Sequence, residues 1–181
     1  PTLMGLKKAG HLYCGFLYAG MMIDKNNDLK VLEFNCRFGD PETQPIMMRL
    51  KSDLADLCDK ACDSNLQNEE LTWDEKKSIG VVMASRGYPF EYEKNKLIGQ
   101  IPDETENLKV FHAGTKIEDN KLKSNGGRVL CVTALGDSVE IAQQNAYDAI
   151  SLIDWEDAYY RKDIGHRAIK RERNESNWSD Y

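Results

Sequence analysis

The sequence predicts an α+β protein of two units: an antiparallel hairpin with a helix, then a small, mostly antiparallel sheet with a covering helix. Three observations support this class. Two apolar runs flank the polar residues 25–28, as the strands of a hairpin flank its turn. Short apolar runs separated by glycine-rich turns fill residues 78–134, which is typical of a sheet. An apolar stripe with helical spacing follows Ser138.

The first unit is expected to open inside a helix. Residues 3–8 have the character of a helix tail and Gly10 is a suitable terminator, so we expect the chain to be a fragment of a longer protein. Strands are expected over residues 12–24 and 29–36, on either side of the polar turn. A short apolar segment follows, and Ser52 is the expected N-cap of a helix that ends near residue 62.

The second unit is expected to form a sheet covered by one helix. Ser138 caps that helix, which should run to about Ile153 with an apolar inner side. We expect strands at 78–85, 108–112 and 128–134, a small hairpin at 116–123 and a short strand or loop at 159–169. The expected domain boundaries give a first unit at 1–64, a linker at 65–77, a second unit at 78–169 and a polar tail at 170–181.

Composition narrows the class of function. With 24 basic and 30 acidic residues the formal charge is -6, which argues against a protein that mainly binds nucleic acid. No apolar run approaches the length of a membrane span, and no signal peptide is recognisable. The five cysteines form no CxxC motif, so we expect a reduced, cytoplasmic setting.

The chemistry-bearing stretch lies at the end of the second predicted strand. Glu33 and Asn35 are two residues apart, so their side chains share one strand face and offer oxygen ligands to a hard cation such as Mg²⁺. Arg37 follows, and its guanidinium can hold a carboxylate or phosphate bidentately. Asp40 and Glu42 then lie in a turn with the Gly-Asp-Pro pattern. The stretch therefore predicts a site for anionic, metal-bound substrates, although a solvated strand face and an ordinary turn would use the same residue types.

The same stretch carries a resemblance to a known family. The run RFGDPETQ at residues 37–44 resembles the signature of the glycinamide ribonucleotide synthetase family. The resemblance covers nearly the whole chain, in the family's order. Its further motifs are GFLYAG (15–20), KSDL (51–54), GYP (87–89), VFHAGT (110–115), NGGRVL (125–130) and RKDIG (161–165).

The resemblance is to the C-terminal part of that family only. It implies that residues 1–64 are the C-terminal portion of an ATP-grasp domain and that residues 78–169 are the small C-terminal domain. It also implies an expected partner, the missing N-terminal half of the same enzyme, which would supply much of the nucleotide cradle. The implied activity is ATP-dependent ligation of glycine to 5-phosphoribosylamine, through glycyl phosphate, with ATP and Mg²⁺ or Mn²⁺ as cofactors.

The resemblance also implies roles for single residues. Glu33 and Asn35 match the family's metal ligands, and Arg37 is the expected catalytic residue, stabilising charge on the carboxylate or acyl phosphate. A structural salt bridge from Arg37 to Asp40 or Glu42 is the alternative. The expected substrate contacts are Asp40, Glu42, Asn125, Gly126, Gly127, Arg128, Lys162 and Asp163.

For some of these residues a structural role explains the pattern as well. Asp40 is suited to cap its turn, and a hairpin turn by itself accounts for residues 125–128. Two other functions also remain open for the chain as a whole. One is another ATP-grasp carboxylate–amine ligase or carboxylase. The other is a non-catalytic assembly module.

Overall fold

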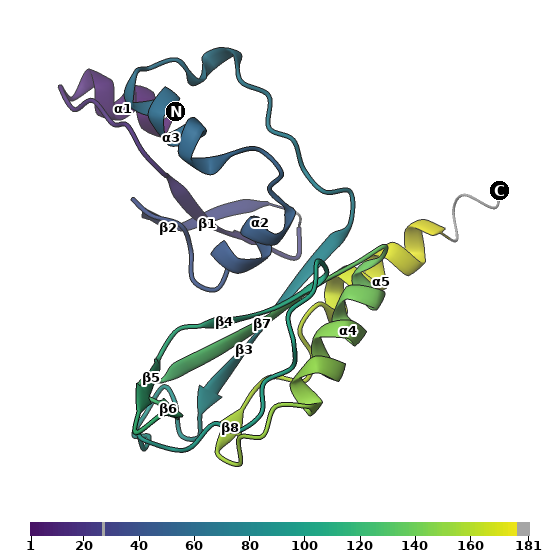
Figure 1. Ribbon diagram of the computed structural model, residues 1–181. Coiled ribbons are helices and arrows are strands. Elements are labelled where there is room, and N and C mark those ends of the chain that lie inside the picture. The colour runs from purple at the N-terminus through teal and green to yellow at the C-terminus, as the bar shows by residue number, and fades with distance from the viewer. Residues whose placement is uncertain (27, 177–181) are drawn as a thin grey trace. The chain divides into compact units, whose positions relative to one another are not determined.

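The computed structural model describes residues 1–26 and 28–176, and its contacts divide these residues into two units (Figure 1). The first unit comprises residues 1–40 and 50–73, and the second comprises residues 41–49 and the chain from residue 74 onward. The helices of the first unit are α1 (Thr2–Lys8), α3 (Leu54–Cys62) and the short η1 (Leu66–Asn68), and its strands are β1 (Tyr18–Ile23) and β2 (Leu29–Asn35). The second unit holds the helices α2 (Thr43–Arg49), α4 (Val139–Ser151) and α5 (His166–Ser176) and the strands β3 (Lys77–Ser85), β4 (Leu108–His112), β5 (Thr115–Glu118), β6 (Lys121–Ser124), β7 (Arg128–Gly136) and β8 (Ala158–Tyr159).

The hairpin of the first unit is formed by β1 and β2 in antiparallel register. A bulge interrupts the register next to Gly20, whose partner is Glu33. The first strand is shorter than the expected 12–24, because it begins at Tyr18 and ends at Ile23. Gly15 has a φ of +132°, and the Tyr13 hydroxyl donates a hydrogen bond to the backbone carbonyl of Phe16. The turn between the strands contains residue 27, which lies outside the described residues.

The helix α3 begins one residue later than the sequence indicates. Its N-cap is Asp53, whose carboxylate accepts hydrogen bonds from the backbone N–H groups of Ala55 and Asp56. Ser52, the expected cap, instead accepts a hydrogen bond from the backbone N–H of Thr72 at 2.8 Å. An aspartate and a serine in succession are both good caps, and the long-range bond to Thr72 decides between them.

The core of the second unit lies between its four-stranded sheet and α4. All neighbours in the strand order β4-β7-β3-β8 are antiparallel. Figure 1 shows α4 running along one face of this sheet. Alternate residues of the central strands face the helix, where Val81 on β3 and Val132 on β7 are fully buried. The helix contributes four buried residues, namely Ala142, Ala146, Ala149 and Ile150. The expected α+β class and the covering helix are confirmed.

The helix α2 packs on β3 and β7 and belongs to the second unit. The sequence places this segment in the first unit, within residues 1–64, so the division found in the structure differs there. Pro45 explains the difference: a Cβ on Gly80 of β3 would lie 2.9 Å from the Pro45 Cγ. The glycine therefore leaves room for the proline ring, and this close approach fixes α2 to the sheet.

The polar segment after residue 169 is helical rather than a tail. The helix α5 extends to Ser176, and residues 177–181 of the expected tail lie outside the described residues. Both carboxylate oxygens of Glu172 accept a hydrogen bond from the backbone N–H of Val139, at 3.1 and 2.9 Å. Arg173 forms an ion pair with Glu140 at 2.5 Å. These contacts tie α5 to the first turn of α4. Within residues 1–26 and 28–176, every helix is too short or too polar to cross a membrane.

The β5–β6 hairpin carries a carboxylate between two lysines, which allows a prediction. Glu118 lies 2.6 Å from the Lys123 Nζ and 2.9 Å from the Lys116 Nζ. Hydrogen bonds from Lys123 and then Lys116 lower the pKa of Glu118 from 4.5 to about 2. A lowered pKa means that the charged pair stabilises the hairpin above about pH 4.5, and that this contribution is lost as the pH falls toward 2. We expect an NMR titration of the Glu118 carboxyl to have its midpoint near 2.

Two variants check the cause of this shift. Lys123→Met should raise the midpoint of the Glu118 titration, because it removes the hydrogen bond that lowers the pKa of Glu118 most. Lys121→Met is the matched control, since among the described residues its side chain has no ion pair with Glu118. An equal response to the two substitutions would contradict the assignment.

Candidate functional site

The end of β2 brings Glu33 and Asn35 together. The amide Nδ2 of Asn35 donates a hydrogen bond to the Glu33 Oε1 at 3.1 Å, so both side chains lie on one face of the hairpin, as the sequence predicts. Asn35 pairs across the hairpin with Tyr18, and the Glu33 side chain is exposed. The bond leaves the amide oxygen of Asn35 and the second carboxylate oxygen of Glu33 as possible ligands for a cation.

Sequence reasoning misses the role of Gly20. This buried residue lies opposite Glu33 on β1, and a Cβ in its place would lie 3.0 Å from the Glu33 Cγ. The glycine thus gives the Glu33 side chain room to lie across the neighbouring strand. The cross-strand register is the signal that reveals this role, and the register depends on a bulge that the sequence does not indicate.

Arg37 follows the strand in an exposed loop that is held by aromatic packing. The centroids of the Phe38 and Phe16 rings lie 4.1 Å apart, and Gly39, which follows Phe38, is buried. The Arg37 Nη1 donates a hydrogen bond to the backbone carbonyl of Phe38 at 2.8 Å. Among the described residues of its own unit, Arg37 has no ion pair with Asp40.

The two acids of the Gly-Asp-Pro turn fall on either side of the division between units. Asp40 is the last residue of the first unit before α2, whereas Glu42 lies in the second unit. Both side chains are exposed.

The glycine turn before β7 is tightly packed. A Cβ on Gly127 would overlap the ring of Tyr88, and Gly126 lies against Gly114. Ser85 fixes the turn through its hydroxyl, which donates to the Gly126 carbonyl at 2.9 Å, and through its backbone N–H, which donates to the Gly127 carbonyl at 2.8 Å. Packing therefore explains why glycines are required here.

The same turn retains features of an anion site. Within the described part of the chain, the backbone N–H groups of Gly126 and Gly127 donate no hydrogen bond, and the neighbouring Asn125 and Arg128 are exposed. Consecutive N–H groups beside a cation can bind a phosphate. Ser85, which anchors the turn, is another residue that sequence reasoning missed.

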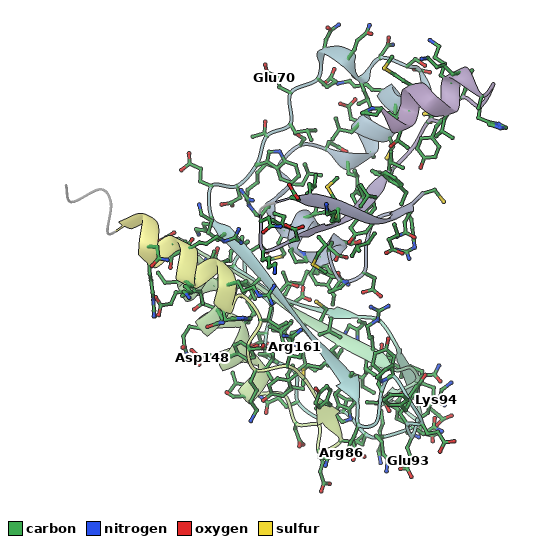
Figure 2. The ribbon with its side chains drawn as sticks, turned by 180° about the vertical axis from the view of Figure 1, so that it is seen from behind. Glu70, Arg86, Glu93, Lys94, Asp148 and Arg161 are labelled. Atoms are coloured by element: carbon green, nitrogen blue, oxygen red, sulfur yellow. The ribbon has the colours of Figure 1, made fainter. Side chains whose placement is uncertain are left out.

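The loop between β8 and α5 carries the last pair of candidates. Arg161 and Asp163 form a bidentate ion pair, in which the Arg161 Nε lies 2.9 Å from the Asp163 Oδ1 and the Nη2 lies 2.7 Å from the Oδ2. These bonds lower the pKa of Asp163 and keep its carboxylate charged. Lys162 is exposed and has no bonded partner among the described residues. Figure 2 labels Arg161 close to α4, on which Asp148 is also labelled.

The candidates are divided between the two units. Glu33, Asn35, Arg37 and Asp40 follow one another along the first unit, and the remaining candidates lie in the second. Among the described residues, no three His, Cys, Asp or Glu side chains gather in a way that could hold a metal by themselves. Glu33 and Asn35 by themselves supply fewer oxygen ligands than a hard cation takes up.

Two family models match the chain. The model of the phosphoribosylglycinamide synthetase ATP-grasp (A) domain matches residues 1–43, and the model of the phosphoribosylglycinamide synthetase C domain matches residues 78–167. The first match covers the β1–β2 hairpin, and the second covers the four-stranded sheet with α4. These matches define a portion of an ATP-grasp protein.

Similar proteins agree with the models. The chain is 56% identical over 176 residues to the phosphoribosylamine–glycine ligase of Escherichia coli K12, and 56% identical over 173 residues to that of Vibrio parahaemolyticus. It belongs to the phosphoribosylglycinamide synthetase family. The matches cover 96% and 95% of the chain but 41% and 40% of the relatives, so the chain spans about two fifths of their length.

Solved structures show the same fold. The crystal structure of phosphoribosylamine–glycine ligase from Thermotoga maritima matches with a TM-score of 0.76 and 36% identity, over 90% of this chain and 40% of that one. The biotin carboxylase domain of a Hydrogenobacter thermophilus 2-oxoglutarate carboxylase, solved with MgADP, matches with a TM-score of 0.60 over 86% of this chain and 34% of that one. Its 15% identity shows a shared fold alone.

Proposed function

We propose that this chain is the C-terminal part of a full-length ligase that joins glycine to 5-phosphoribosylamine and forms ADP, phosphate and glycinamide ribonucleotide. The observation that carries the proposal is the 56% identity to phosphoribosylamine–glycine ligases over nearly the whole chain. In this assignment the first unit belongs to the ATP-grasp domain and the sheet with α4 is the small C-terminal domain. The 15% identity to a biotin carboxylase reflects the shared fold alone and gives the alternative carboxylase function no support.

The pair at the end of β2 suits a cation that is carried by ATP. Mg²⁺ is usually held by one or two protein ligands together with substrate phosphates, rather than by a cage of protein groups. Glu33 and Asn35 supply two such oxygens, and their mutual hydrogen bond fixes both side chains. When bound there, Mg²⁺ or Mn²⁺ would neutralise charge on the ATP phosphates.

The proposed ligation needs no nucleophile from the protein. A carboxylate oxygen of glycine attacks the γ-phosphorus of ATP, and the bond to ADP breaks to leave glycyl phosphate. The amine nitrogen of 5-phosphoribosylamine then attacks the acyl carbon, releases phosphate and loses a proton. Catalysis is then a matter of positioning and charge stabilisation. Arg37 suits the second task because its guanidinium is exposed and bonded only to a neutral carbonyl among the described residues.

The remaining candidates are proposed substrate contacts. Asp40 and Glu42 carry charges that suit the ammonium of glycine or the amine of the ribosyl substrate. In the second unit, the turn at 125–128 offers two N–H groups and a cation for the ribose 5-phosphate. Lys162 adds a second cation, while Asp163 is paired with Arg161 and orients that guanidinium.

The exposed apolar surface of the β1–β2 hairpin is consistent with a further part of the ligase that packs against it. Isolated two-stranded hairpins are marginally stable in water, and large exposed apolar patches mark surfaces that contact other protein. Many apolar residues of β1 and β2 are about half exposed or more, namely Met21, Met22, Ile23, Leu29, Val31, Leu32 and Phe34. We propose that the N-terminal half of the same ligase covers this surface and supplies most of the nucleotide cradle.

A direct prediction separates the chain from the full-length ligase. The full-length ligase should form ADP and glycinamide ribonucleotide from glycine, 5-phosphoribosylamine and MgATP, as measured by coupled ADP detection and mass spectrometry. The chain alone, residues 1–181, should form no stoichiometric ADP because it lacks that cradle. ADP formation by the purified chain would contradict the prediction. A full-length ligase inactive with glycine would overturn the proposed function and favour a non-catalytic assembly role.

A further inference from the structure

Two polar side chains of α4 hold both ends of the loop at residues 161–164. The Tyr147 hydroxyl donates a hydrogen bond to the Arg161 carbonyl at 2.6 Å and accepts one from the Ile164 N–H at 3.1 Å. The Gln143 Nε2 donates to the Ile164 carbonyl at 2.5 Å. Because Gln143 and Tyr147 are four residues apart, they lie on one face of the helix. Three hydrogen bonds thus fix the backbone on either side of the loop's charged centre.

The hydroxyl of Tyr147 is separable from the packing of its ring. The ring packs against the core of the second unit and lies 6.3 Å from the ring of Tyr160, between centroids. Burial is the main cause that raises the pKa of Tyr147, so its hydroxyl stays protonated at neutral pH and can serve both bonds. A phenylalanine would keep the ring contacts and lose only the bonds to the loop.

The exposed charged residues of the loop suggest a reason for its anchoring by α4. Lys162 and Asp163 lie between the two anchored positions, and both side chains are exposed. A charged group at the tip of a short loop recognises a ligand well only when its backbone is fixed in advance. We propose that Tyr147 and Gln143 are positioning residues, which hold this loop in the conformation that binds the phosphorylated amine substrate. This inference rests on the proposed function of the chain.

The test compares two tyrosines in the full-length ligase. Tyr147→Phe should raise the KM for 5-phosphoribosylamine about tenfold, because two hydrogen bonds to the loop are lost, each of modest net strength. The KM values for glycine and ATP and the kcat should change less than about twofold. Tyr160→Phe is the matched control, since among the described residues its hydroxyl forms no hydrogen bond. This control should leave all these constants unchanged.

Two further measurements make the outcomes distinct. Hydrogen exchange at the Ile164 N–H should be faster in Tyr147→Phe than in Tyr160→Phe. Lys162→Ala tests the loop itself: an unchanged KM for the amine substrate would remove the proposed substrate role of the loop and this inference with it. A raised KM in Lys162→Ala beside an unchanged KM in Tyr147→Phe would overturn the positioning role alone. A uniform fall in kcat with a lowered melting temperature would make Tyr147 a structural residue and would also overturn it.

Discussion

Glu33→Gln is expected to lower the turnover of the full-length ligase by about a hundredfold or more while leaving its fold intact. The substitution keeps the shape of the side chain and removes the negative charge, which is what a divalent cation requires of this ligand. The glutamine can still bond to Asn35, so the hairpin geometry should persist. The measurement is the steady-state rate as a function of Mg²⁺ concentration, together with thermal unfolding.

The Mg²⁺ dependence separates a ligand from a structural acid. The variant should need a higher Mg²⁺ concentration for half-maximal rate, because a neutral ligand binds the cation more weakly. Glu69→Gln is the control in the same unit, since Glu69 forms an ordinary ion pair with Lys60 at 3.0 Å. We expect that variant to show the rate and Mg²⁺ requirement of the unmodified ligase. Near-normal turnover of Glu33→Gln at limiting Mg²⁺ would exclude Glu33 as a ligand.

Local sequence patterns predict most elements of this fold because their causes are local. Alternation along β2 places Glu33 and Asn35 on one face, and the structure confirms it with a direct hydrogen bond. The apolar stripe after Ser138 similarly predicts a helix with one buried side, as found for α4. In both cases the spacing of neighbouring residues decides the outcome.

Other features depend on contacts between distant residues, which spacing does not reveal. The helix α2 joins the second unit because Pro45 fits against Gly80, 35 positions further along the chain. The polar sequence after residue 169 is tied to the start of α4 through the bonds that Glu172 accepts from the Val139 N–H. A polar run read by itself gives no sign of such a partner.

The residues of the candidate site likewise fall into those that the sequence indicates and those that only the structure reveals. The chemical types at Glu33, Asn35 and Arg37 indicate a metal and an anion, since those side chains act through their own charge and oxygens. Gly20 and Tyr147 act through other residues: Gly20 leaves space for the Glu33 side chain, and Tyr147 donates a hydrogen bond to the Arg161 carbonyl. Such supporting roles become visible only when the register and the helix contacts are known.

The second large effect is expected at Arg37, where Arg37→Met should lower kcat by about a hundredfold to a thousandfold. The guanidinium is proposed to face charge that develops on the glycine carboxylate and acyl phosphate, and removing one such donor typically costs this much. Among the described residues its only bond is to the Phe38 carbonyl, so the loss of this side chain breaks no ion pair and the melting temperature should change little.

The comparison with lysine sharpens the role of Arg37. Arg37→Lys keeps the positive charge but loses the planar fork of donors, so it should recover only part of the lost rate. The half-maximal Mg²⁺ concentration should stay unchanged in both variants, in contrast to Glu33→Gln. Arg173→Met is the matched control, because Arg173 is an exposed arginine whose partner is Glu140 on α4. Full activity in Arg37→Lys would reduce the role to that of a simple charge, and full activity in Arg37→Met would remove the residue from the catalytic site.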